Sequence, residues 1–310
     1  MSGLDGFNLQ LPLVCAPMFL VSGPDMVVAA SKAGIGGAFP STNCRTLGEL
    51  EQWLATITAE VRADDGPWIL NLITHSSRKR LTDELRLVAE YRPPIVITAL
   101  GSPKPVMETV KGYGGLVFAD VVNLALARKA AEAGVDGMAC ISAGAGGHTG
   151  QLSPFAFIAA IRDMFQGVIA IGGGIADGYG IAGAVAAGAD CVYMGTRFIA
   201  TQESLAAERY KTMVLESGIE DLVVSSAVTG TSASWLKASL AEAGFTEEAL
   251  TGQVARDYSG SDAKRWRDVW AAGQGVGSSR VLQSVASVVA DLKGEYRAGA
   301  ARLNASPLNS

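Results

Sequence analysis

The feature that most limits the fold is a regular alternation between short apolar runs and longer stretches with helical spacing. Eight runs of five or six residues are largely apolar along their whole length, which is typical of parallel strands buried on both faces of a sheet. Eight strands that are each followed by a helix predict an α/β protein with a (β/α)8 TIM barrel, and an open doubly wound sheet is the alternative. The predicted strands are residues 13–18, 36–40, 68–73, 95–100, 116–121, 137–142, 168–172 and 191–196.

Glycine is the second constraint, because 37 of the 310 residues are glycine, roughly 12% against a usual value of ~7%. With 49% apolar residues, 18% charged residues and no Gly-X-Y repeat, the composition excludes collagen and disorder. Gly34, Gly134 and Gly188 each follow a helical stretch, where a left-handed cap is expected. Many of the others gather at one predicted end of the barrel, in 144–150, 172–178, 195 and 273–277.

The spacing of apolar residues changes after the eighth strand and divides the chain into four predicted units. Residues 1–200 form the barrel core, 201–278 a small, mostly helical cap or inserted subdomain, 279–297 the closing helix of the barrel, and 298–310 a tail. Within the cap we expect helices over 204–217, 235–243 and 262–272, and an irregular apolar segment over 221–229.

Charge and cysteine usage exclude other classes of protein. The net charge is -5 and no Lys/Arg block is present, which argues against nucleic acid or an anionic membrane as a partner. Without a leader-like start or an 18-residue apolar run, a cytoplasmic protein is expected. The four cysteines are isolated in the sequence, so neither a disulfide framework nor a metal site is predicted.

A phosphate site is predicted after the seventh and eighth strands, where TIM barrels commonly bind phosphate. Gly172, Gly173 and Gly174 follow the seventh strand and leave the backbone open to an anion, and Asp177 is placed to cap the next helix. Gly195 and Thr196 follow the eighth strand and offer backbone N–H groups and a hydroxyl. The alternative is that these glycines only form tight turns.

The two histidines, His75 and His148, both follow a predicted strand, at the end of a barrel where catalytic groups lie. His148 lies in a glycine-rich loop that can pack closely on a planar ligand, and a neutral imidazole is suited to removing a carbon-bound proton at neutral pH. The alternative for either residue is a histidine that only bonds its own loop. His75 lies beside Arg78, Lys79 and Arg80, and a basic helix start at the surface explains it about as well as a catalytic role does.

Five motifs occur in an order and spacing that resembles the nitronate monooxygenase (2-nitropropane dioxygenase) family over nearly the whole chain. They are Ala16-Pro17-Met18, Asn71-Leu72, 144–150, 172–178 and 194–198. Members are barrels that bind FMN noncovalently, and the wider group includes FMN-dependent reductases. The resemblance therefore implies a flavoprotein oxidoreductase with FMN as cofactor.

The resemblance also implies roles for individual residues. His148 matches the catalytic base, and Gln274 matches a glycine-rich stretch that closes over the flavin. One departure is Asp120, since some relatives carry Lys or His in that strand, so a basic group near the flavin is missing. The implied cofactor-binding residues are Ala16, Pro17 and Met18 against the ring, Asn71 and Asp120 near its polar edge, Gly147 in the histidine loop, Gly172, Gly173, Gly174, Gly195 and Thr196 at the phosphate, and Gln274.

The implied reaction is oxidation of alkyl nitronates, and of nitroalkanes, with O2 to carbonyl compounds and nitrite. An NAD(P)H:quinone or enoyl-thioester reductase with the same FMN site is the alternative, and a flavin- or phosphometabolite-binding protein without catalysis is a third. The use of NAD(P)H, the natural substrate and homo-oligomer formation stay open.

Overall fold

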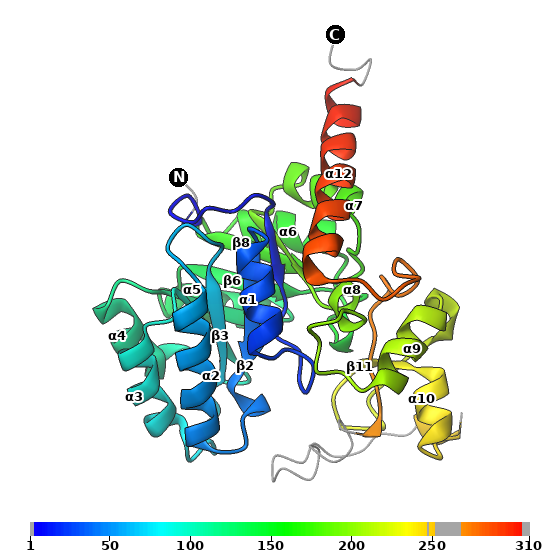
Figure 1. Ribbon diagram of the computed structural model, residues 1–310, viewed down its shortest axis with the longest axis horizontal. Coiled ribbons are helices and arrows are strands. Elements are labelled where there is room, and N and C mark those ends of the chain that lie inside the picture. The colour runs from blue at the N-terminus through cyan, green and yellow to red at the C-terminus, as the bar shows by residue number, and fades with distance from the viewer. Residues whose placement is uncertain (1–2, 247, 252–267, 306–310) are drawn as a thin grey trace.

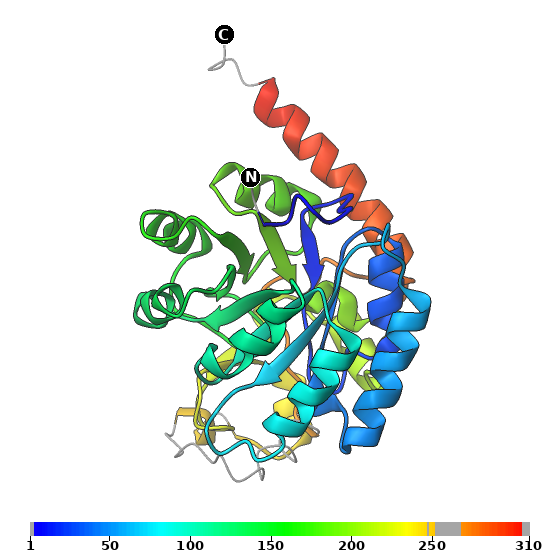
Figure 2. The ribbon, with the colours of Figure 1, turned by 90° about the vertical axis from the view of Figure 1, so that its left-hand side faces the viewer.

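A computed structural model describes residues 3–246, 248–251 and 268–305. Eight parallel strands close into a barrel in the order β1-β2-β3-β4-β5-β6-β8-β9, and β1 pairs with both β2 and β9 (Figures 1 and 2). This confirms the (β/α)8 barrel and excludes the open sheet. The strands are β1 (Leu13–Cys15), β2 (Gly36–Pro40), β3 (Trp68–Ile73), β4 (Ile95–Ala99), β5 (Leu116–Val121), β6 (Gly137–Ile141), β8 (Val168–Gly172) and β9 (Cys191–Met194).

Helices cover the outside of the barrel between successive strands (Figure 2). Side-chain caps begin several of them: Asn123 Oδ1 accepts a hydrogen bond from Leu126 N at 2.9 Å, and Asp177 Oδ1 accepts one from Gly180 N at 2.6 Å. Glycines at positive φ follow α1, α5 and α7, as expected for Gly34, Gly134 and Gly188. The helices are α1 (Pro24–Lys32), α2 (Leu47–Glu60), α3 (Leu81–Tyr91), α4 (Lys104–Gly112), α5 (Leu124–Glu132), α6 (Pro154–Arg162), α7 (Gly178–Ala186) and α8 (Thr196–Ile199).

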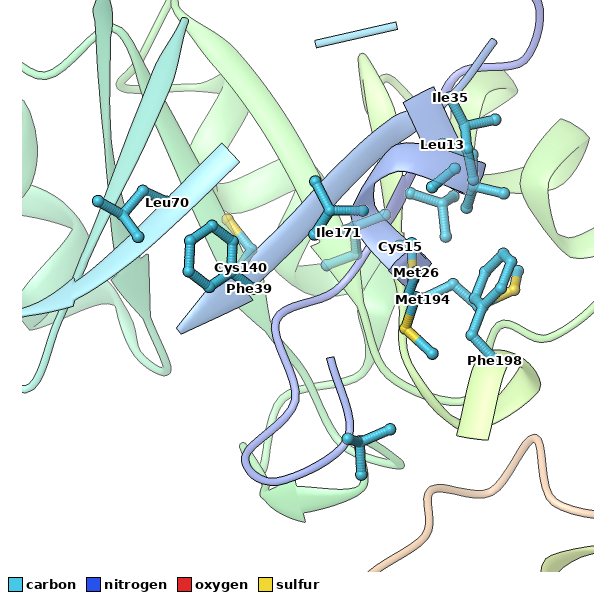
Figure 3. Packing of buried hydrophobic residues seen from close by; sticks show 14 of the residues in the cluster. Leu13, Cys15, Met26, Ile35, Phe39, Leu70, Cys140, Ile171, Met194 and Phe198 are labelled. Carbon is cyan, nitrogen blue, oxygen red and sulfur yellow. The ribbon is translucent and has the colours of Figure 1, made fainter. Parts of the chain in front are cut away.

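Alternation along each strand builds two separate cores. In β1, Val14 points into the barrel, whereas Leu13 and Cys15 point toward the helices. Figure 3 shows the layer between barrel and helices, in which Phe39 and Leu70 pack. All four cysteines are buried free thiols, and burial raises their pKa, so they act as small apolar side chains.

The strand predictions agree closely with the structure. Four strands, β2, β3, β5 and β8, have the predicted bounds, and the other four end one to three residues earlier. The early ends occur because the chain turns into the site loops while it is still apolar. Among the described residues no helix is long and apolar enough to cross a membrane.

The cap differs from the prediction because it contains strands. The segment 221–229, expected to be irregular, holds β10 (Leu222–Ser225), and β11 (Ala233–Leu236) occupies the start of the helix expected over 235–243. Together with β7 (Gly147–His148) these form an antiparallel sheet in the order β10-β11-β7. Trp235 is fully buried in this sheet, which favours an extended chain over an exposed helix start.

The cap helices are shorter than predicted. They are α9 (Glu208–Glu216) in place of 204–217 and α10 (Lys237–Glu242) after β11, with short 3-10 turns at Ile219–Asp221 and Ala249–Thr251. The helix expected over 262–272 lies mostly outside the described residues. The division into units at 200, 278 and 297 stays a prediction.

The last helix, α12 (Val285–Asn304), packs on α7 and α1 and so closes the ring of helices (Figure 1). Glycine makes this contact close, because a Cβ at Gly178 would lie 2.2 Å from Tyr296 N. Helix was predicted from residue 279, but it starts later because Ser284 caps it. The helix continues to Asn304, past residue 298 at which the tail is predicted to begin.

A buried acid fastens α3 to the end of β2. The Glu84 carboxylate is fully buried, and its Oε1 lies 2.9 Å from Ser41 Oγ, 2.9 Å from Arg78 Nη2 and 2.9 Å from Arg80 Nε. A carboxylate in such a position is stable only with its cationic partners, and those partners depend on it equally.

We expect Glu84→Gln to lower the free energy of unfolding by about 3 kcal/mol, because it leaves two half-buried guanidinium groups without a counter-charge. Urea denaturation measures the change. The matched control is Glu90→Gln on the exposed face of the same helix, which we expect to change stability by less than about 0.5 kcal/mol. Equal midpoints for the two variants would contradict the prediction.

Candidate active site

Segments that are far apart in the sequence meet at the carboxyl ends of the barrel strands. The carbonyl oxygen of Gly144, after β6, accepts hydrogen bonds from Gly174 N at 3.1 Å and from Gln274 N at 2.8 Å. Gly273 N donates to Thr196 Oγ1, after β9, at 2.9 Å. The structure therefore brings together the predicted phosphate loops, the histidine loop and the late glycine-rich stretch.

Glycine is required where these segments touch. Gly144, Gly173 and Gly174 have φ values of +87°, +131° and +69°, which side chains rarely adopt. A Cβ at Gly146 would lie 2.6 Å from Gly273 N, so the two backbones are in contact. The segments therefore meet backbone to backbone at the carboxyl end of the barrel, an arrangement whose N–H groups are suited to binding an anion.

The turn after β1 is fixed beside the loop after β9. Ala16 N donates to Met194 O at 2.9 Å, and Met18 N donates to Ser22 Oγ at 3.0 Å. A Cβ at Gly195 would lie 3.3 Å from Met18 Sδ. Ala16, Pro17 and Met18 thus adjoin the second predicted phosphate loop, as expected of residues that contact one ligand.

Asn71 and Asp120 meet across the mouth of the barrel. Asn71 Nδ2 donates to Asp120 Oδ2 at 3.4 Å, while Asp120 Oδ1 is buried and has no hydrogen-bond partner among the described residues. Burial raises the pKa of Asp120 to about 7, and the hydrogen bond from Asn71 lowers it in part. A buried oxygen without a partner, beside bare backbone, indicates a place for a ligand with a polar edge.

The two histidines have different surroundings. His148 is exposed and lies in β7, where its backbone pairs with Ala233 of the cap. His75 Nδ1 lies 2.8 Å from Ser77 Oγ and also accepts from Ser77 N at 3.3 Å. His75 thus bonds its own loop, whereas His148 belongs to the loop that joins the site to the cap.

Sequence reasoning missed the link between site and cap. Thr149 N donates to Ser232 O at 3.1 Å, and Ser234 Oγ donates to Ala272 O at 2.7 Å. The period-2 alternation of Ser232, Ala233, Ser234 and Trp235 was the available signal for a strand. Tyr193 was also missed; its buried hydroxyl has no hydrogen-bond partner. Within the described ranges no group of three or more His, Cys, Asp or Glu side chains could hold a metal ion.

Comparison with known proteins shows the family and the fold of the chain. The sequence model of the nitronate monooxygenase family matches residues 68–294. An octahydro-indene-carboxyl-CoA dehydrogenase of Rhodococcus jostii is 30% identical over 72% of this chain and 62% of its own length. A nitronate monooxygenase of Neurospora crassa is 28% identical over 66% of this chain and 64% of its own length. The chain thus spans less than two thirds of these relatives.

Solved structures show the same architecture over nearly the whole chain. FabK from Thermotoga maritima has a TM-score of 0.80 and 25% identity, with 97% of each chain covered. A nitroalkane oxidase from Streptomyces ansochromogenes has a TM-score of 0.80 and 22% identity, with 97% of this chain and 99% of that chain covered, which supports the fold alone.

The glycine loops and the buried polar groups at the mouth of the barrel fit a flat, phosphorylated ligand such as a flavin. The chain belongs to the nitronate monooxygenase family, whose sequence model matches residues 68–294.

We expect Gly273→Ala to destabilise the protein by about 2 kcal/mol, because the new Cβ would lie 2.6 Å from Gly144 O and force the two segments apart. The control is Gly112→Ala at the end of α4, where a Cβ meets nothing within 4 Å and should stabilise by about 0.5 kcal/mol. Urea denaturation of both variants measures the difference, and a Gly273→Ala protein as stable as wild type would disprove the close contact.

Proposed function

We propose that this protein is an FMN-dependent nitronate monooxygenase that oxidises alkyl nitronates with O2 to carbonyl compounds and nitrite. The observation that carries the proposal is the convergence of the loops after β6, β8 and β9 with Gly273 and Gln274. Only a ligand with both an anionic end and a flat polar end would use all of them. FMN has both, and membership of the family supports it.

Each part of the site has a role in holding FMN. The backbone of 172–174, with Gly195 and Thr196, would hold the phosphate, and the turn Ala16-Pro17-Met18 would contact the ring. Asn71 and Asp120, which are hydrogen-bonded to each other, would bind its polar edge, and Gly147 and Gln274 would complete the cofactor site. When bound, FMN supplies the electron transfer and the reaction with O2.

His148 is the base in this proposal. It removes the proton from the carbon next to the nitro group of a neutral nitroalkane, and its position on β7 next to the cap suits contact with substrate. A nitronate has already lost that proton. The need for His148 therefore depends on which form of the substrate is offered.

We expect His148→Asn to lower kcat/KM for a nitroalkane by about 100-fold and to lower it much less for the corresponding nitronate. Oxygen uptake and nitrite release are measured with both forms, and His75→Asn is the matched control. Absorption spectra of the purified protein and mass analysis of the released cofactor identify FMN. A wild-type protein that binds FMN but consumes no oxygen with nitronates would rule out the proposed reaction.

A second candidate function has specific support. Two of the relatives, from Rhodococcus jostii and Mycobacterium tuberculosis, are named as carboxyl-CoA dehydrogenases, so an acyl thioester is the substrate class to test, together with reduction by NAD(P)H. Anaerobic mixing with NADH and NADPH separates the candidates. Rapid bleaching of the flavin, followed by reoxidation with an enoyl thioester or a quinone, would favour the reductase over the monooxygenase.

A further inference from the structure

Asp120 is an acid of the site with a buried carboxyl oxygen, and it forms no ion pair with any residue the structure describes. It lies near the end of β5 on the face that points into the barrel, since Phe118 points inward and Val117 and Val121 point outward. Oδ2 accepts from Asn71 at 3.4 Å, and Oδ1 is buried with no partner. In the described part of the chain no lysine or arginine forms an ion pair with it.

The titratable groups near Asp120 offer it no positive charge. Tyr193 on β9 is close enough for a negative Asp120 to raise the pKa of the phenol, and the Cys140 thiol on β6 is affected in the same direction. Burial of both groups keeps them neutral at ordinary pH. Asn71 on β3 is uncharged, and the neighbouring strand β4 ends in Thr98 and Ala99. The charge of Asp120 is therefore governed by burial and by whatever lies on Oδ1.

Two buried polar atoms on the inner face of the barrel, without hydrogen-bond partners among the described residues, indicate what that ligand must offer. Oδ1 of Asp120 either accepts or, when protonated, donates a hydrogen bond, and the Tyr193 hydroxyl does both. The polar edge of an isoalloxazine ring alternates carbonyl oxygens with an N–H group and matches such a set. If Asp120 lies against a ligand whose charge changes during turnover, the charge of the carboxyl group and the charge of the ligand are coupled, because both are buried.

We propose that Asp120 is a redox-coupled proton acceptor that holds a proton on Oδ1 when the bound flavin gains negative charge and releases it when the flavin is reoxidised. This inference rests on the proposed function. When Asp120 is ionised in the oxidised protein, one proton moves from solvent to its carboxylate for each two electrons that the ring takes from its substrate, and reoxidation by O2 returns that proton to solvent. Asp120 acts by tuning the reduction potential of the flavin, and it exchanges no proton with the substrate.

The balance of charge gives the direction of the effect. Burial raises the pKa of Asp120 to about 7, so its carboxyl group is mostly neutral below that pH and ionised above it. Above pH 7 a negative carboxylate opposes reduction unless it takes up a proton. The reduction potential of the wild-type protein should then fall more steeply with pH than that of a variant that cannot titrate.

The experiment compares flavin midpoint potentials of wild type, Asp120→Asn and Glu132→Gln from pH 5.5 to 8.5. Glu132 is an exposed acid at the far end of α5, so its loss removes the same charge away from the site. One extra proton per two electrons corresponds to about 30 mV per pH unit, the value for a tenfold change in a two-electron equilibrium. We expect wild type and Glu132→Gln to show this extra slope above pH 7, and Asp120→Asn to lack it and to have the higher potential there.

A second measurement needs no variant. Reduced-minus-oxidised infrared difference spectra of the wild-type holoprotein at pH 8 should gain a carboxylic acid C=O band that shifts when the protein carries 13C-labelled aspartate. Absence of this band, or equal slopes of potential against pH in Asp120→Asn and wild type, would overturn the inference about Asp120. If that same protein still turns over nitronates, the proposed function is unaffected. A protein that binds no flavin would overturn both.

Discussion

The hydrogen bonding of β1 to β9 is the constraint on which the rest of the structure depends, because it turns a row of parallel strands into a closed barrel. Closure leaves no sheet edge and collects every strand-to-helix loop at one end. Residues as distant as Ala16 and Met194 become hydrogen-bonded neighbours in this way. The closed topology brings the loops of the site together, and side-chain contacts then add to the backbone contacts between them.

The sequence predicted this barrel well because its signal is physical. A strand buried on both faces must be apolar at every position, and helices that end at glycine separate the strands clearly. The loops after β8 and β9 followed from their place in the barrel, without any knowledge of contacts. By contrast, the involvement of Gln274 came only from family resemblance, since a segment so distant in the chain carries no local signal for where it docks.

Other parts of the site could not be read from the sequence. The strand β7 is only two residues long, too short for a periodic pattern. The predicted helix over 235–243 takes in the second half of its partner β11, whereas α10 begins at Lys237. Tyr193 lies in an apolar run and looks like a core residue until the register shows that it points into the barrel. The unpartnered oxygen of Asp120 depends on three strands at once, so only the closed structure exposes it.

The pairing of His148 with Ala233 makes the cap part of the histidine's support. Side chains in a strand alternate between faces, so a one-residue insertion between Ser232 and Trp235 would slide the ladder and turn every side chain of β11 to the opposite face. Lengthening the chain at 243–246, after α10, where the described residues pair with no strand, would leave that register alone. Proteins that diverge from this one should therefore differ in the number of cap residues after β11. The stretch that pairs with β7 should keep its number of residues even where the residue types change.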